Sequence, residues 1–468
     1  MVTGEAVAAR VQPHRIVVPV LLSGPLLSAM DAFIVTVAIP SLQADLGAEP
    51  AQVQLLIAGY ALTYGTGMVT GGRLGDLFGR RRVFVLAIAL FTVMSMLCGL
   101  ATSPGFLLAA RLAQGAAAAL MVPQVLAIFS ALYDGEDRAK AINSYGVVAG
   151  LGAVLGQAVS GLLITADLFG SGWRACFFVN VPVGVAAVVL ALRFVPETRA
   201  PGRPRLDLAG MALVTGALLA VVVPLTVGRD RGWPPWTWFC FAAAVPLFAV
   251  FGHRQRRAES PVVDLGLFRL RAFSVGMVCQ LVFWTGQGAY YLVLGLYLQL
   301  GRGMDALASG LLFVVVNVGF MASALGARRL AVLLGRQVLA LGALVRVVAL
   351  VAELVVVTRI GDGGNVAWLV PWLLLDGAGM GLVVAPLATT VLARVPHARA
   401  GSASGVLATG VQVGVALGVA LVGLIFYGAL AGAGYAHAFG LSLLYPIGAG
   451  VVLALLVQFL PVRKAAGS

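Results

Sequence analysis

Charged residues are scarce in this sequence. Only 10% of the 468 residues are Asp, Glu, Lys or Arg, whereas about 25% is typical of a soluble globular domain. Hydrophobic residues make up 60%, and the mean hydropathy is +1.00. A water-soluble fold is therefore excluded, and the chain is predicted to be an integral membrane protein.

Acidic residues are fewer than basic ones. The 18 Asp and Glu against 31 Lys and Arg leave a formal net charge of +13, which could indicate nucleic-acid binding. The basic residues fall in alternate loops, however, so membrane topology explains them better and no nucleic acid is expected as a partner. All but two of them are Arg. This bias is typical of a GC-rich bacterial gene, and we expect the protein in the bacterial plasma membrane.

Residues and motifs for catalysis and metal binding are also few. The four Cys are isolated within apolar stretches, in neither disulfide nor metal-site spacing. Neither a G-x-x-x-x-G-K-[ST] phosphate loop nor an H-E-x-x-H motif occurs, and the stretch 401–405 misses a G-x-S-x-G elbow because its third residue is Ala403. An enzyme or an ATP-driven pump is therefore disfavoured, and we expect neither a metal nor another cofactor.

Long apolar runs, by contrast, recur along the whole chain. Fourteen of them have the length needed to cross a bilayer as a helix. They cover residues 16–39, 52–70, 83–101, 106–130, 141–164, 173–195, 208–228, 236–252, 273–300, 307–327, 337–358, 367–392, 403–430 and 438–460. The first run is too long for a signal peptide and lacks a convincing cleavage site, so it is expected to remain as a helix.

The basic residues predict how these spans are oriented. If the loops alternate between the two faces, 24 Lys and Arg lie on the face of the termini and five lie on the other face. Short cytoplasmic loops collect Lys and Arg, so both termini are predicted to be cytoplasmic.

An internal repeat divides the chain. At a fixed offset of 262 residues, run 141–164 matches run 403–430, and run 106–130 matches run 367–392. The matching glycines are Gly152 with Gly414, Gly156 with Gly418 and Gly161 with Gly423. Such glycines are expected to let helices pack closely. The repeat indicates two parallel six-helix halves, residues 1–195 and 273–468, with two extra helices in the linker 196–272.

A charged, glycine-rich turn joins the second and third runs. It contains Gly72, Asp76, Gly79, Arg80 and Arg81. A cytoplasmic loop that only sets the topology is one interpretation of its Arg residues. The spacing of two glycines, an acid and an Arg pair is more than such a loop requires, and it is the most specific single signal in the chain.

Five ionisable residues lie well inside the predicted spans, where each is costly and is by default a functional candidate. They are Asp31, Arg111, Arg346, Glu353 and Asp376. Asp31 and Arg111 are expected at a similar depth and can form a pair. Burial favours the protonated acid whereas Arg111 favours the carboxylate, so Asp31 could take up and release a proton. A static ion pair that only fixes helix packing is the alternative.

The remaining three are interpreted differently. The repeat places Asp376 opposite Gln114, so both are expected to face a common central space. There Asp376 could bind a proton or a cationic group of a substrate, or make only a structural hydrogen bond. Arg346 and Glu353 lie seven residues apart on one helical face and are expected to extend toward opposite headgroup layers.

Run 273–300 is rich in aromatic and amide side chains, namely Gln280, Trp284, Gln287, Tyr290, Tyr291 and Tyr297. In a membrane helix such residues can be interface anchors, but this many in one span favours the wall of a cavity for bulky amphipathic molecules. The predicted cavity residues are Gln114, Trp284, Gln287, Tyr290 and Tyr291.

The chain resembles the major facilitator superfamily, and its six, two, six arrangement resembles the fourteen-helix drug:proton antiporters over nearly its whole length. Gly72, Asp76, Gly79, Arg80 and Arg81 match the superfamily's loop motif. Asp31, Ala38 and Pro40 match the first-helix motif, and Arg111, Gln114, Gly115 and Ala119 match the Arg-x-x-Gln-Gly motif associated with proton transfer. The antiporter motif departs from the usual pattern, with Gly156-Gln157 and Ser160-Gly161 in place of Gly-Pro and Gly-Gly.

The resemblance implies an all-α membrane fold of two pseudo-symmetric six-helix bundles plus two central helices. It implies proton-driven export of hydrophobic or cationic drugs by alternating access. Asp76 and the Arg cluster would form a cytoplasmic latch that stabilises the outward-facing state. Asp31, Arg111 and Asp376 are the predicted proton-coupling residues, and a monomer is expected. Proton-coupled uptake by the same fold and a non-transporting membrane sensor are the alternatives.

Overall fold

The computed structural model describes residues 16–199, 206–259, 261–396 and 399–461. The chain ends, whose cytoplasmic location is predicted, and residues 200–205 of the predicted linker lie outside the described residues. Nearly all of the described chain is helical, because a backbone in lipid must satisfy its N–H and C=O groups internally.

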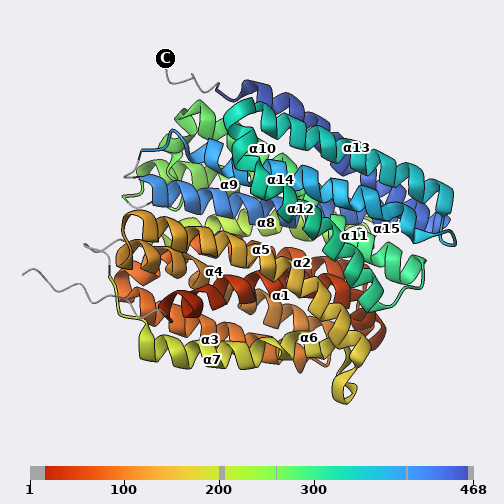
Figure 1. The fold of residues 1–468 in the computed structure, drawn as a ribbon, viewed down its shortest axis with the longest axis horizontal. Helices are drawn as coiled ribbons and strands as arrows, with labels where there is room; N and C mark the ends of the chain where they lie inside the picture. The colour runs from red at the N-terminus through yellow and green to blue at the C-terminus, as the bar shows by residue number, and fades with distance from the viewer. Residues whose placement is uncertain (1–15, 200–205, 260, 397–398, 462–468) are drawn as a thin grey trace, which may run out of the picture.

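The first bundle crosses six times and forms one side of the molecule (Figure 1). Its sixth crossing is built from the short α6 and the longer α7, which follow two 3₁₀ turns. The helices are α1 (Val17–Leu46), α2 (Pro50–Phe78), α3 (Arg80–Gly99), α4 (Pro104–Leu132), α5 (Gly135–Ala166), α6 (Ala175–Phe178) and α7 (Asn180–Phe194).

Two further helices, α8 (Leu208–Val227) and α9 (Pro235–Arg257), pack against each other. α8 also contacts α2 of the first bundle and α15 of the second, so it covers the line where the bundles meet. Asp207 caps the N-terminus of α8 by accepting a hydrogen bond from the Gly210 N–H.

The second bundle lies beside the first (Figure 1). Its first crossing is interrupted twice, since α10 ends at Gly288, α11 begins at Tyr290 and a π-helical turn covers Tyr297–Gly301. The helices are α10 (Arg271–Gly288), α11 (Tyr290–Leu296), α12 (Ala306–Leu334), α13 (Gln337–Ile360), α14 (Val370–Leu392) and α15 (Ala400–Leu456). The predicted all-α fold is confirmed; the division at residues 195 and 272 stays a prediction.

Twelve helices of the described chain are long and apolar enough to cross a membrane, two fewer than predicted. α2 is long enough but is not among the twelve. The predicted run 403–430 and most of run 438–460 fall within α15, and the second run continues into a 3₁₀ turn at Val457–Phe459. α15 departs from helical geometry at Gly434, with φ 82° and ψ 173°. The count of fourteen is therefore not confirmed.

The most extensive contacts between the bundles are those of α2 with α15 and of α5 with α12. Their approach is close where glycine leaves room for a neighbouring backbone. A Cβ atom on Gly161 of α5 would lie 2.6 Å from the carbonyl oxygen of Ala306 at the start of α12. The other predicted packing glycines lie within a bundle, Gly152 and Gly156 against α1 and Gly414 and Gly418 against α10.

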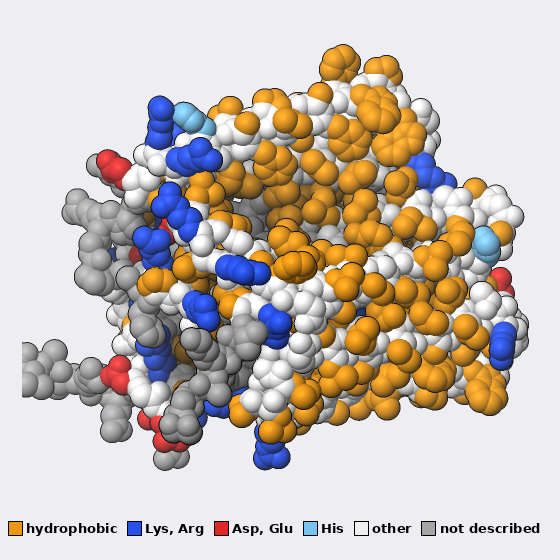
Figure 2. All heavy atoms as spheres, turned by 90° about the horizontal axis from the view of Figure 1, so that it is seen from above, with side chains coloured by type: hydrophobic (Ala, Val, Ile, Leu, Met, Phe, Trp, Pro, Cys, Tyr) orange, Lys and Arg blue, Asp and Glu red, His pale blue; other side chains and the backbone are white. Residues whose placement is uncertain are grey.

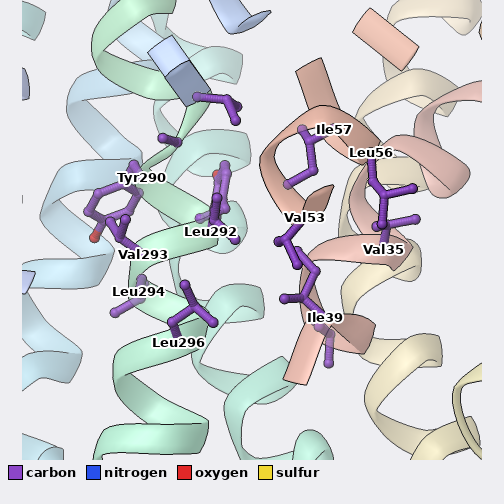
Figure 3. Close-up of a cluster of buried hydrophobic side chains, with 14 of the residues drawn as sticks. Val35, Ile39, Val53, Leu56, Ile57, Tyr290, Leu292, Val293, Leu294 and Leu296 are labelled. Atoms are coloured by element: carbon purple, nitrogen blue, oxygen red, sulfur yellow. The ribbon is translucent and has the colours of Figure 1, made fainter. Parts of the chain in front are cut away.

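The hydrophobic core is shared at one end of the molecule and divided at the other. The shared core joins side chains from the end of α1 and the start of α2, such as Ile39 and Val53, to α11 residues such as Leu292 (Figure 3). Toward the opposite end, where α2 meets α3, each bundle has a core of its own. The bundles are therefore held together most firmly at the end of the α1–α2 turn.

Lys and Arg side chains gather at the opposite end of the molecule, and hydrophobic side chains cover the flank between the two ends (Figure 2). This distribution is the one expected of a multi-pass membrane protein. Placing the basic end in the cytoplasm stays a prediction from the charge pattern.

Candidate functional site

A cavity of about 280 Å³ lies between the two bundles. Both bundles contribute to its wall, through α1, α2, α4 and α5 on one side and α10, α11 and α15 on the other. The lining includes Pro25, Ser28, Phe33, Thr36, Tyr60, Tyr64, Arg111, Tyr145, Trp284, Gln287, Gly288, Tyr291 and Gln412. Any molecule held there touches both halves, so its binding is sensitive to how they are arranged.

Aromatic rings dominate this wall. The rings of Phe33 and Tyr291 meet edge to face across the two bundles, with centroids 5.5 Å apart. Within the described chain, the Tyr60 and Tyr291 hydroxyls, Trp284 Nε1 and Gln287 Nε2 are buried without a hydrogen-bond partner. Buried polar groups are normally paired. These four therefore offer hydrogen bonds to a molecule in the cavity.

The helix break in the second bundle lies at this wall. Gln287 and Gly288 end α10 and Tyr291 belongs to α11, and all three line the cavity. A Cβ atom on Gly288 would lie 2.4 Å from the Val415 carbonyl oxygen of α15. The glycine thus allows the broken segment to pack on α15. Breaks and π-turns of this kind often mark functional sites in helices.

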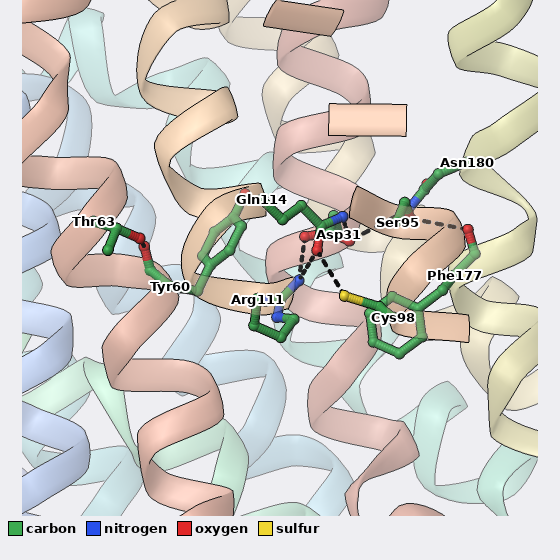
Figure 4. Close-up of polar contacts among 9 residues, drawn as sticks. All are labelled: Asp31, Tyr60, Thr63, Ser95, Cys98, Arg111, Gln114, Phe177 and Asn180. Atoms are coloured by element: carbon green, nitrogen blue, oxygen red, sulfur yellow. Dashed lines mark hydrogen bonds and ion pairs between the residues drawn. The ribbon is translucent and has the colours of Figure 1, made fainter. Parts of the chain in front are cut away.

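Asp31 and Arg111 form an ion pair, as their predicted depths suggested. Arg111 Nη1 lies 2.5 Å from Asp31 Oδ2, and both residues are at most 1% exposed (Figure 4). Gln114 Nε2 donates to Asp31 Oδ1 at 2.8 Å, and Asn180 Nδ2 donates to the same oxygen at 3.3 Å. The carboxylate is thus held by three side chains from α4 and α7.

The pair also touches the cavity. The Arg111 guanidinium lies 4.1 Å from the centroid of the Tyr60 ring, and both side chains line the wall, whereas Asp31 lies behind Arg111 and outside the lining. A change in the charge of Asp31 therefore reaches the cavity through Arg111.

The sequence analysis missed the partners contributed by α3 and α7. Asn180 Nδ2 also donates to Ser95 Oγ at 3.0 Å, and the Ser95 hydroxyl donates to the Phe177 carbonyl oxygen. Asn180 is fully buried in an apolar run. That isolated polar residue within a predicted span was the signal that could have revealed it.

A second buried cluster lies in the other bundle. Arg346 Nε of α13 donates to Asp376 Oδ1 of α14 at 2.9 Å, and Arg346 Nη2 donates to Gln287 Oε1. The Tyr290 hydroxyl donates to Glu353 Oε2 at 2.8 Å. Arg346 is 4% exposed and Glu353 and Asp376 are fully buried. The prediction that Arg346 and Glu353 extend to the headgroup layers is therefore wrong, because both find polar partners inside the bundle.

The predicted cavity residues divide into two groups. Trp284, Gln287 and Tyr291 line the cavity. Gln114 and Tyr290 do not, because their polar atoms point to Asp31 and Glu353. Asp376 is also outside the lining, so the expectation that it shares a central space with Gln114 is wrong.

The loop motif joins three segments at the basic end. Asp76 accepts two hydrogen bonds from Arg80, whose Nη1 also donates to the Ala127 carbonyl oxygen of α4. Gly79, with φ 105°, makes the turn between α2 and α3. Glu197, which the sequence analysis did not single out, accepts from the backbone N–H groups of Arg81 and Arg82.

Arg73, next to Gly72, contacts the segment between α9 and α10. Its Nη2 donates a hydrogen bond to the Pro261 carbonyl oxygen. Gly72 lies near Pro123 of α4. Over the described residues, no three or more His, Cys, Asp or Glu side chains gather in a way that could hold a metal ion.

Comparisons with known proteins place these features in context. A family model described as Major Facilitator Superfamily matches residues 21–419. The probable actinorhodin transporter of Streptomyces coelicolor is 39% identical over 426 residues, which are 88% of this chain and 72% of that protein. The puromycin resistance protein of Streptomyces alboniger is 34% identical, covering 88% and 82%. The tetracenomycin C resistance and export protein of Streptomyces glaucescens is 32% identical, covering 86% and 74%.

Solved structures agree on the fold. An auto-inhibited POT family peptide transporter has a TM-score of 0.70 at 16% identity, covering 96% of this chain and 98% of its own. The xylose transporter XylE from E. coli, in an inward-open conformation, has a TM-score of 0.64 at 16% identity, covering 96% and 97%.

Proposed function

The chain belongs to the major facilitator superfamily, and we propose that it is a proton-coupled antiporter that exports hydrophobic or cationic antibiotics from the bacterial cell. The observation that carries the proposal is the buried Asp31–Arg111 pair whose Arg111 lines the cavity between the bundles. The names of the relatives, which concern antibiotic export and resistance, support the direction and the kind of cargo.

Proton coupling acts through Arg111, which is held by Asp31 on one side and lines the cavity on the other. As a carboxylate, Asp31 accepts hydrogen bonds from Arg111, Gln114 and Asn180. Protonation removes the charge that holds Arg111, and a buried arginine without a counter-charge is strongly destabilised. Arg111 then shifts at the cavity wall, where it stands over Tyr60. Proton uptake by Asp31 and retention of cargo thus oppose each other.

Alternating access follows from the way the bundles meet. The shared core closes the end of the α1–α2 turn, which we place outside the cell, and the separate cores lie at the basic end, which we place in the cytoplasm with both termini. The glycine contact of α5 with α12 lets the bundles tilt about this seam. The loop motif, whose Asp76–Arg80 contacts already join α2, α3 and α4 in this conformation, is proposed to latch the opposite, outward-facing state.

The cavity wall suits amphipathic aromatic cargo. Its rings bury apolar surface and its four unpartnered polar atoms supply hydrogen bonds. A cationic cargo would be held over the faces of Tyr and Trp rings, which attract cations, since the lining described above contains no carboxylate. The protein needs no cofactor for this cycle and acts as a monomer.

The test uses everted membrane vesicles from a pump-deficient bacterial host that expresses the chain. With an inward-acidic proton gradient, we expect the vesicles to accumulate actinorhodin, puromycin or tetracenomycin C, and a protonophore to abolish the accumulation. Vesicles without the chain are the control. Movement in the opposite direction would indicate an uptake symporter, and no gradient-dependent movement of any cargo tested would favour a non-transporting sensor.

A further inference from the structure

The second bundle contains one more buried carboxyl group than its buried arginine can neutralise. Around Asp31, one carboxylate faces one guanidinium. Around Arg346, two carboxyl groups, Asp376 and Glu353, share one guanidinium. All three side chains are at most 4% exposed, so the charges are not balanced by water.

The hydrogen bonds of the three side chains show which carboxyl group is the extra one. Arg346 is engaged by Asp376 at 2.9 Å and by Gln287. Glu353 receives a hydrogen bond from the neutral Tyr290 hydroxyl. Within the described chain, Glu353 Oε1 and Asp376 Oδ2 both have no hydrogen-bond partner, so the contact with Arg346 is what distinguishes the two acids. An ionised Glu353 would therefore be a buried charge without a matched counter-charge, which is far more costly than a neutral acid.

The surroundings of Glu353 provide no other compensation. The titratable and charged groups that act on it are Tyr290 from α11, Asp376 from α14 and Arg346 from its own helix. α15 also packs on α13, and it brings apolar side chains such as Phe439 and Leu443 into the same core.

The position of Tyr290 connects this carboxyl group to the cavity. Tyr290 is the first residue of α11, directly after the break that follows Gly288. Gln287, on the other side of the break, lines the cavity and is bonded to Arg346. A rearrangement of this segment therefore moves the Tyr290 hydroxyl relative to Glu353 at the same time as it changes the cavity wall.

We propose that Glu353 is a second proton-binding site, gated by Tyr290, so that each transport cycle moves two protons. In the present conformation Glu353 Oε1 carries the proton. When the α10–α11 segment shifts and water enters, the proton passes from Oε1 to water, and the carboxylate faces Arg346. On the opposite side of the membrane Glu353 takes a proton back from water. This inference rests on the proton coupling proposed above.

The first experiment measures stoichiometry in proteoliposomes at zero voltage. For an uncharged cargo, net transport stops at a certain ratio of cargo concentrations across the membrane. This ratio grows about tenfold per pH unit for each coupled proton. We expect about 100-fold per pH unit for the wild type and about tenfold for Glu353→Gln. Glu136→Gln makes the same change at an exposed site and should match the wild type. The proposal would be overturned if Glu353→Gln reached the same cargo concentration ratio as the wild type, or if the wild type reached only about tenfold per pH unit.

A second measurement does not depend on transport. The infrared C=O stretching band of a protonated carboxyl group should be present in the wild type at neutral pH, persist in Asp31→Asn and be absent in Glu353→Gln. Tyr290→Phe should keep the band and move it to higher wavenumber, because the carbonyl oxygen loses its hydrogen bond. A band unchanged in Glu353→Gln would refute the assignment even if that variant were inactive. Failure of Asp31→Asn to alter coupling would count against the proposed function alone.

Discussion

Gln299 Nε2 donates a hydrogen bond to the Val37 carbonyl oxygen at 3.1 Å, and the two residues are separated by 262 positions. This is the offset that aligns the two halves of the sequence. The contact therefore joins positions that the repeat treats as equivalent, and such positions can touch only close to the pseudo-two-fold axis that relates the bundles. It ties α1 to the π-helical turn at the end where the core is shared.

Gln299→Leu is expected to weaken the closure of this end. The loss of one neutral hydrogen bond, about 1 kcal/mol, shifts a two-state equilibrium about fivefold. In a background without native cysteines, Val53→Cys in the shared core reports the change through its rate of labelling by a membrane-impermeant maleimide. We expect a several-fold faster rate with Gln299→Leu. Gln458→Leu, which changes an exposed side chain at the other end, should leave it unaltered; equal rates in all three proteins would disprove the role of the contact.

Asp31→Asn is expected to abolish proton-driven export while the protein still inserts and folds. Asn keeps the size of the side chain and can still accept from Gln114 and Asn180, but it cannot exchange a proton and leaves Arg111 without its counter-charge. Efflux from energised vesicles should fall to the level of the empty host, with normal amounts of protein in the membrane. Full efflux in this variant would remove Asp31 from the mechanism and leave the pair a structural one.

Gly156→Ala should separate α5 from α1. An added Cβ would lie 2.5 Å from the Met30 carbonyl oxygen and 3.1 Å from its Cα. Because the obstacle is backbone, the helices must shift, at a cost of about 1–3 kcal/mol. Thermal unfolding in detergent should show a lower midpoint and vesicle transport a lower rate. Gly146→Ala is the matched control in the same helix, since nothing lies within 4 Å of its added Cβ. Equal midpoints for the two variants would contradict the packing account.

Asp207 provides a pH-dependent prediction outside the membrane-spanning segments. Burial alone would raise the pKa of its carboxyl group, but hydrogen bonds from Gln255, the Gly210 N–H and Arg254 outweigh burial and hold the pKa below its usual value. A group with a lowered native pKa adds stability above its unfolded pKa, about 3.9, and this contribution is lost as the pH falls through the native value. The wild type should therefore unfold at a higher temperature than Asp207→Asn at pH 7. The difference should shrink on acidification below about pH 4, and a constant difference would contradict the assignment.

Most of the fold could be predicted from the sequence because membrane insertion depends on local properties. Apolar runs, the alternation of basic loops and the spacing of Asp76, Gly79 and Arg80 are each contained in one short stretch of chain. The repeat at a fixed offset predicted two bundles without any contact being known. The two membrane-span differences are also local in origin, since no membrane-length stretch of α2 is as apolar as those of the twelve helices and Gly434 marks a kink between two helical segments of α15.

The partners of buried polar groups depended on the tertiary structure. Nothing near Arg346 in the sequence indicates that it meets Asp376 rather than the headgroups, because the choice depends on how α13 faces α14. The same holds for Asn180 at Asp31 and for Tyr290 at Glu353. The sequence by itself determined that charged groups are buried in a two-part membrane bundle, since composition and order decide that much. Only the packing of distant helices decided which of them meet, and hence which carboxyl group has a counter-charge.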